Sequence, residues 1–133
     1  MTEGPLIVVV DDDESVRESL HELLREFGFT VRSFASAEEC LIDGRIGEAC
    51  CLVSDIDMPG MSGCDLQQEL RRRGENVPIV FISAHADDVL RSQVLEQGAL
   101  ACLCKPFSDI VLLETIRAVL GGAVTGGRSD TGQ

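Results

Sequence analysis

The feature that most constrains this sequence is a repeated alternation of short strand-like runs with stretches of helical spacing. The strand-like runs occupy residues 6–10, 30–34, 51–54, 78–82 and 100–104. The first run, LIVVV, is continuous and β-branched, as expected of a strand that is covered on both faces. Strands that alternate with helices along a chain are joined by right-handed crossovers into a parallel sheet. The sequence therefore predicts an α/β sandwich.

Helices are predicted between these runs. Apolar residues from Val16 to Phe27 recur at helical spacing, Gly28 supplies a stop, and Asp13 is predicted to cap the start of this helix. Ser36 and Glu39 form a capping-box pattern that predicts a short helix to about residue 43. Further helices are predicted over about 64–73, 87–97 and 109–120.

The length and composition predict one domain followed by a tail. A chain of 133 residues is typical of a single domain, and we assign it to residues 1–121. Residues 122–133 contain Gly, Ser, Thr and Asp but almost nothing to bury, so we expect a flexible tail or linker there.

Charge and cysteine content narrow the class of protein. The formal net charge is −12, which argues against direct nucleic-acid binding by this domain, because phosphate contacts need clustered Lys and Arg. We find no apolar stretch long enough for a membrane span and no signal peptide, so we predict a cytoplasmic location without membrane binding. The six cysteines lack zinc spacing and lie mostly in apolar surroundings, so we expect reduced thiols within the core.

Polar residues follow four of the strand-like runs. These residues are Asp11 and Asp12, Asp55, Ser83 and Lys105. Ligand sites of open parallel sheets lie beyond the carboxyl ends of the strands, so the five side chains should meet at one edge. A single Asp after a strand is commonly a helix cap, but the arrival of all five groups at one edge indicates a site.

The chemistry of this cluster predicts phosphoryl transfer with a divalent cation. Carboxylates without His or Cys suit a hard ion, so we predict Mg²⁺, with Mn²⁺ as a substitute. A Lys and a Ser hydroxyl would neutralise and hydrogen-bond a phosphoryl group, and an Asp carboxylate is a competent nucleophile.

The motifs at these strand ends resemble those of a known family. "VVVDDD", "LVSDIDMPGMSG", "VFISAH" and "CLCKPF" are similar to the receiver domains of bacterial two-component response regulators, over residues 6 to about 120. The resemblance implies a doubly wound (βα)5 fold of the CheY and flavodoxin type, with a parallel five-stranded sheet in the order 2-1-3-4-5. The turn after the fourth strand and the "KPF" ending resemble FixJ-type receivers, which usually precede a helix-turn-helix DNA-binding domain.

The resemblance also implies a role for each matching residue. Asp55 would be the phosphoacceptor, supplied by a phosphohistidine on a sensor histidine kinase. Asp12 and Asp55 would bind Mg²⁺ directly, together with the backbone carbonyl of Asp57, and Asp11 would act through a water.

The resemblance also implies which residues would respond to phosphorylation. Ser83 would hydrogen-bond the phosphoryl group, and Lys105 would pair with it and precede a cis bond to Pro106. Phosphorylation would then change the surface of the fourth helix, fifth strand and fifth helix and control an output, expected to be transcription. A phosphorylation-dependent homodimer is a further expectation.

Three positions depart from the pattern or vary within it. Cys102 stands where the family usually carries a switch aromatic, so we expect a muted or altered switch. Asp57 and His85 occupy positions that often tune hydrolysis of the acyl phosphate, and either side chain could instead be a solvated loop residue.

Other classes of protein share parts of this sequence pattern. A single-domain regulator without an output domain, or a degenerate receiver that only binds partners, would keep the fold. The Asp-x-Asp of "DIDMP" also occurs in haloacid dehalogenase-type phosphatases, but Pro59 stands where that family has Thr or Val and no cap domain is present. We therefore expect a phosphoacceptor signalling domain, whose only chemistry is its own phosphorylation and dephosphorylation, and not an enzyme.

Overall fold

The structure is a computed structural model that describes residues 4–121, and it contains one parallel sheet. Five strands lie in the order β2-β1-β3-β4-β5, and each neighbouring pair is parallel. The strands are β1 (Leu6–Val10), β2 (Thr30–Phe34), β3 (Cys51–Asp55), β4 (Ile79–Ser83) and β5 (Ala101–Cys104). The predicted fold class and strand order are confirmed.

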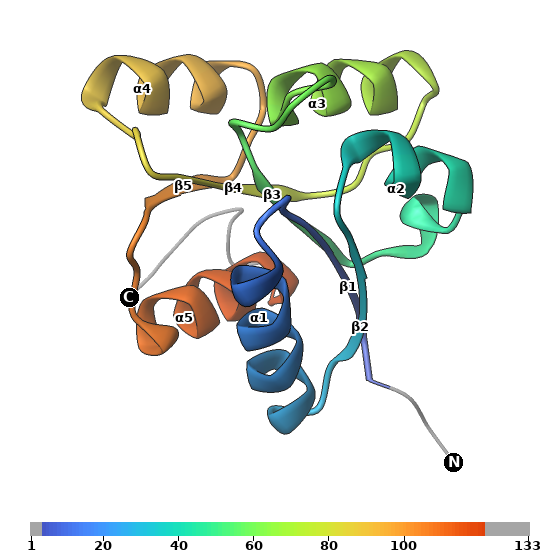
Figure 1. Cartoon of the computed structure of the whole chain (residues 1–133), viewed down its shortest axis with the longest axis vertical. Helices are drawn as coiled ribbons and strands as arrows, with labels where there is room; N and C mark the ends of the chain where they lie inside the picture. The colour runs from blue at the N-terminus through green and yellow to red at the C-terminus, as the bar shows by residue number, and fades with distance from the viewer. Residues whose placement is uncertain (1–3, 122–133) are drawn as a thin grey trace.

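Helices cover both faces of the sheet, as Figure 1 shows. Helices α1 (Glu14–Glu26) and α5 (Asp109–Leu120) lie on one face. The other face carries α2 (Ala37–Asp43), α3 (Gly63–Arg72) and α4 (Asp88–Glu96). A short 3₁₀ helix, η1 (Ile46–Glu48), lies between α2 and β3.

The core is divided into two clusters, one on each face of the sheet, because the side chains of successive strand residues point to opposite faces. In β1, Val8 and Val10 face α2, α3 and α4, whereas Ile7 and Val9 face α1 and α5. All five residues of β1, β3 and β4 are buried, as predicted for strands covered on both faces. The central strands are therefore held rigidly by packing on both sides.

The helix starts agree with the capping predictions. The Asp13 carboxylate accepts a hydrogen bond from the Ser15 backbone N–H at the start of α1, and Ser36 accepts one from Glu39 at the start of α2. Reciprocal capping-box bonds occur instead between Ser62 and Asp65 at the start of α3. This cap fixes the end of the loop that follows β3.

The boundaries differ slightly from the predictions. The fourth strand begins at Ile79 and extends to Ser83, and the third extends to Asp55. The predicted strand included Pro78, which lacks the N–H that a ladder position donates. Asp55 and Ser83 therefore terminate strands instead of following them, so the sheet itself positions both side chains. The predicted tail over 122–133 lies outside the described residues.

Candidate functional site

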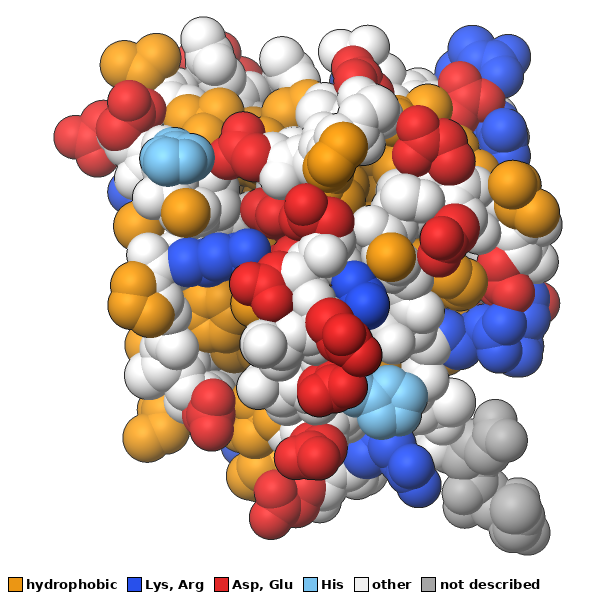
Figure 2. Space-filling model, viewed as in Figure 1, with side chains coloured by type: hydrophobic (Ala, Val, Ile, Leu, Met, Phe, Trp, Pro, Cys, Tyr) orange, Lys and Arg blue, Asp and Glu red, His pale blue; other side chains and the backbone are white. Residues whose placement is uncertain are grey.

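Three carboxylates converge at the carboxyl ends of β1 and β3. Ligand oxygens of Asp11, Asp12 and Asp55 lie within 4.8 Å of one another. Asp11 and Asp55 are buried, whereas Asp12 is exposed. Figure 2 shows acidic side chains gathered across the middle of the visible face, with a Lys or Arg side chain beside them. The predicted convergence of these carboxylates is confirmed.

The first two aspartates have different surroundings. Asp11 Oδ1 accepts a hydrogen bond of 2.9 Å from the Asp13 backbone N–H, and Oδ2 accepts one of 2.9 Å from Lys105 Nζ. Both oxygens of Asp11 are therefore engaged inside the protein. The exposed carboxylate of Asp12 remains open on the solvent side.

Lys105 joins the ends of β1 and β3. Its Nζ lies 2.9 Å from Asp11 Oδ2 and 3.5 Å from Asp55 Oδ2. Burial disfavours the ammonium ion, but the hydrogen bond and charge of Asp11 and the charge of Asp55 raise the pKa of Lys105 above its ordinary value. The cation is thus held in its charged form beside the carboxylates. The Lys105–Pro106 peptide bond is cis, as the sequence resemblance implied.

Asp55 is a buried carboxylate under electrostatic stress. Burial raises the pKa of Asp55 to about 6, and the charge of Asp11 adds to the rise. Lys105 and a hydrogen bond from the backbone of Asp57 lower it, but not enough to compensate. A cation bound beside Asp55 would relieve this stress, because it would offset the negative charge of the clustered carboxylates.

The donor set suits a hard divalent cation. It consists of carboxylate oxygens, and Mg²⁺ in proteins takes oxygen ligands and retains several waters. Asp12 is exposed enough to take part while water completes the coordination. The residues present therefore fit the predicted Mg²⁺ site.

Ser83 ends β4 beside this cluster, but its hydroxyl contacts a different carboxylate. Asp55 pairs with Ile82 in the parallel ladder, so Ser83 lies one residue further along the neighbouring strand. Ser83 Oγ donates to Asp57 Oδ2 over 3.2 Å and accepts from the His85 backbone N–H over 3.0 Å. The sequence singled out Asp57, Ser83 and His85 separately and did not predict this connection.

Several supporting contacts carry no strong sequence signal. The Met61 backbone N–H donates to Glu38 Oε2 over 3.1 Å, which ties the loop after β3 to α2. Gly63 lies so close to β3 that a Cβ there would be 2.5 Å from the Asp55 carbonyl oxygen. Arg17 Nη1 donates to the Asp11 carbonyl oxygen over 2.8 Å. Met61 and Gly63 lie within the motif LVSDIDMPGMSG, whereas no motif singles out Glu38 or Arg17.

Cys102 and the other cysteines are free thiols. Cys102 is buried under α4, and its carbonyl oxygen accepts a hydrogen bond of 3.2 Å from Arg91 Nε. Burial raises the pKa of Cys40 and of Cys51 to about 12, in line with the predicted core thiols. Cys50 and Cys104 are exceptions, because both are exposed: Cys50 directly precedes β3 and Cys104 ends β5.

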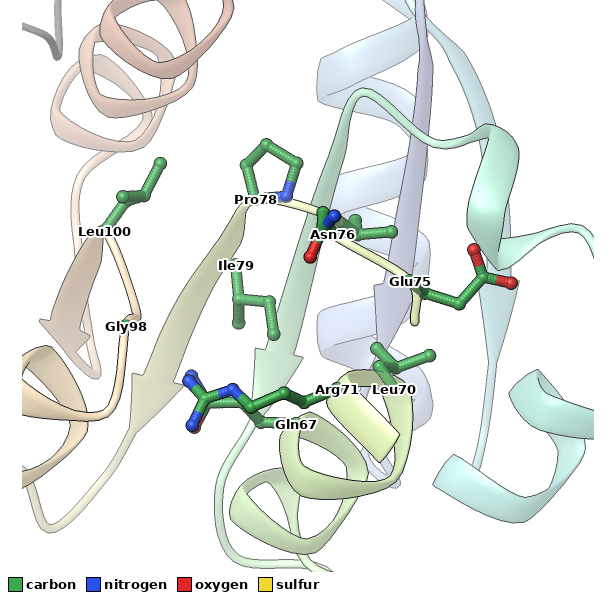
Figure 3. Close-up of a pocket in the computed structure, with 10 residues that line it drawn as sticks. Gln67, Leu70, Arg71, Glu75, Asn76, Pro78, Ile79, Gly98 and Leu100 are labelled. Carbon is green, nitrogen blue, oxygen red and sulfur yellow. The ribbon is translucent and has the colours of Figure 1, made fainter. Parts of the chain in front are cut away.

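A cavity of about 320 Å³ lies at the opposite end of the sheet. Figure 3 shows Pro78 and Ile79 at the start of β4, with Gln67 and Arg71 extending from α3. Ser83, at the end of the same strand, belongs to the carboxylate site. This cavity is therefore separate from the site.

The structure is a doubly wound α/β domain with a cluster of carboxylates at the carboxyl ends of its strands, and comparison with known proteins gives the family. A model described as the response regulator receiver domain matches residues 7–117. The chain therefore belongs to the response regulator receiver domain family. Members of this family are signalling domains.

Individual relatives agree with this assignment. The response regulator protein TodT of Pseudomonas putida is 41% identical over 115 residues, which cover 86% of this chain and 51% of TodT. The transcriptional regulatory protein FixJ of Azorhizobium caulinodans is 37% identical over 130 residues, which cover 98% of this chain and 62% of FixJ. The chain thus spans about half to two-thirds of the length of these relatives.

Solved structures show the same fold. The response regulator StyR is 44% identical, with a TM-score of 0.79 over 89% of this chain and 60% of StyR. The FixJ-N crystal structure is 33% identical, with a TM-score of 0.78 over 90% of this chain and 96% of that one. No helix in residues 4–121 is long and apolar enough to cross a membrane.

Proposed function

We propose that this domain accepts a phosphoryl group on Asp55 from a phosphohistidine of a sensor histidine kinase. The observation that carries the proposal is a buried acceptor carboxylate with Lys105 Nζ at 3.5 Å and two further carboxylates beside it. An aspartate carboxylate can act as a nucleophile toward phosphorus.

The transfer exchanges one bond to phosphorus for another. A carboxylate oxygen of Asp55 forms the new P–O bond while the P–N bond to the histidine breaks, and the electron pair of that bond stays on the nitrogen. Lys105 Nζ is placed to stabilise the negative charge that gathers on the phosphoryl oxygens. Hydrolysis of the acyl phosphate then restores Asp55.

A divalent cation completes the chemistry. Asp12, Asp55 and the backbone carbonyl of Asp57 would hold Mg²⁺, and Asp11 would act through a bound water. The ion would neutralise phosphoryl charge and orient the oxygens for in-line transfer. The engaged oxygens of buried Asp11 and the exposed carboxylate of Asp12 support this division of roles.

A groove beside Lys105 offers a docking place for the kinase. It has a volume of about 580 Å³ and lies between α1 and the segment after β5, with Val16, Leu20, Pro106 and Phe107 among its lining residues. Its apolar walls next to the phosphoacceptor edge suit a partner helix that delivers a phosphohistidine.

The output surface would be formed by α4, β5 and α5. Val89 in α4 and Ile110 in α5 are 66% and 68% exposed, so this side carries apolar residues that a partner or a second copy could cover. Relatives such as FixJ are transcriptional regulatory proteins, which favours control of transcription, here through an attached DNA-binding domain. We extend that output to this chain as part of the proposal.

Incubation with acetyl phosphate tests the acceptor role. Intact-mass spectrometry should show the gain of one phosphoryl group that requires Mg²⁺ and is abolished in Asp55→Asn. Asp88→Asn, which changes an exposed aspartate of α4, is the matched control and should be labelled like wild type. Labelling that persists in Asp55→Asn would refute the proposal.

A further inference from the structure

The hydroxyl of Ser83 already has a charged acceptor in the resting domain. Ser83 Oγ lies 3.2 Å from Asp57 Oδ2, and because an ionised carboxylate only accepts, the hydroxyl is the donor. Ser83 is fully buried, and the His85 N–H donates to the same Oγ over 3.0 Å. A serine hydroxyl has one proton, so it cannot donate to Asp57 and to a phosphoryl oxygen at the same time.

We infer that Asp57 is a positioning residue that competes with the phosphoryl group on Asp55 for the proton of Ser83. The inference rests on the proposed function of Asp55 and Ser83. In the resting domain Asp57 engages the hydroxyl, and in the phosphorylated domain the hydroxyl leaves Asp57 and donates to the phosphoryl group. Asp57 thereby raises the free-energy cost of the activated arrangement.

The position of Asp57 is set by the loop and not by Ser83 alone. The Gly63 N–H donates to the Ile56 carbonyl oxygen over 3.0 Å, which closes the loop on either side of Asp57. The Met61 N–H is held by Glu38 of α2. Asp57 itself is exposed, and within residues 4–121 its carboxylate accepts a side-chain hydrogen bond from Ser83 only. Its replacement should therefore release Ser83 without unfolding the loop.

Charge acts in the same direction as the hydrogen bond. A phosphoryl group on Asp55 adds negative charge at the edge where Asp57 already carries one, so the two groups repel. Asp57→Ala removes both the charge and the hydrogen-bond acceptor, so this variant alone cannot separate the two effects. A double-mutant cycle with Ser83 isolates the part that acts through the hydroxyl.

The test measures binding of beryllofluoride, a phosphoryl analogue, in the presence of Mg²⁺ by amide NMR titration. Asp57→Ala should raise the apparent affinity about fivefold beyond its effect in a Ser83→Ala background, which is the size expected for one released hydrogen bond. Asp57→Asn, which keeps an acceptor oxygen, should give a smaller gain. Glu14→Gln removes an exposed charge from the first turn of α1 and serves as the charge control, with a change below about twofold.

The outcomes separate this inference from the proposed function. Equal effects of Asp57→Ala in both backgrounds, or weaker binding in Asp57→Ala alone, would overturn the inference while leaving Asp55 as the acceptor. A wild-type chain that does not bind beryllofluoride would overturn both. In metal-free protein, the His85 amide resonance should shift in Asp57→Ala, because that N–H donates to the hydroxyl that changes partner. An unchanged His85 resonance would also overturn the inference.

Discussion

Asp55→Asn should stabilise the resting domain, and the gain should depend on pH. In the folded protein, burial and the charge of Asp11 raise the pKa of Asp55 from 3.8 to about 6. The folded chain therefore binds more protons than the unfolded chain between about pH 4 and pH 6, and stability falls as the pH rises through this window. Asparagine does not titrate, so the variant escapes this loss.

The magnitude follows from the size of the shift. A rise from 3.8 to about 6 corresponds to about 3 kcal/mol, since one pKa unit is about 1.4 kcal/mol. Asp55 is 5% exposed, so solvent screening reduces this value little. We expect Asp55→Asn to be more stable by about 2–3 kcal/mol at about pH 7.5 and by under about 1 kcal/mol at about pH 4.

Urea denaturation followed by circular dichroism in EDTA measures this difference. Chelation is needed because a bound cation would neutralise the same charge. Asp88→Asn, the exposed control, should change stability by less than about 0.5 kcal/mol at either pH. A gain that is the same at both pH values, or a destabilised Asp55→Asn at about pH 7.5, would refute the electrostatic account of this site.

Three further predictions address the cation, the loop and the thiols. Mg²⁺ at 100 times its Kd should raise the free energy of unfolding by about 2.7 kcal/mol. At the same Mg²⁺ concentration, Asp12→Asn should gain less stability than wild type, and an equal gain in that variant would exclude Asp12 as a ligand. Gly63→Ala should cost about 1–3 kcal/mol in thermal or urea unfolding, because its Cβ would lie 2.5 Å from the Asp55 carbonyl oxygen. The exposed Gln68→Ala is its control, and equal stability of the two variants would contradict the close packing. Iodoacetamide should label exposed Cys50 and Cys104 well before Cys40 and Cys51, whose pKa values burial raises to about 12, as peptide mass spectrometry can show. Equal labelling rates would contradict the assignment of core thiols.

The fold could be predicted from the sequence because local pattern and global packing agree. The continuous run from Leu6 to Val10 has no polar residue, and only a strand covered on both faces can bury all of it. The helix caps at Asp13 and Ser36 could be predicted for the same reason. A short polar side chain just before a helix accepts a hydrogen bond from one of the first free backbone N–H groups. The helix η1 was missed because three residues are too few to show periodicity.

Only the part of the site that follows from the sheet topology could be predicted from the sequence. Parallel strands deliver their carboxyl ends to one edge, so Asp11, Asp55 and Lys105 were expected together. The hydrogen bond from Ser83 to Asp57 depends on the path of the loop after β3, which side-chain pattern does not specify. The bond from Met61 to Glu38 joins two segments far apart in the chain, and no spacing rule predicts such a pair.

The most direct test of the central claim locates the phosphoryl group on the chain. After incubation with acetyl phosphate and Mg²⁺, borohydride reduction converts an aspartyl phosphate to homoserine, and peptide sequencing by mass spectrometry identifies the residue. We expect homoserine at position 55 of wild-type protein and none in a sample incubated without Mg²⁺. Homoserine at Asp11, Asp12 or Asp57, or its absence throughout, would contradict the assignment of Asp55 as the phosphoacceptor.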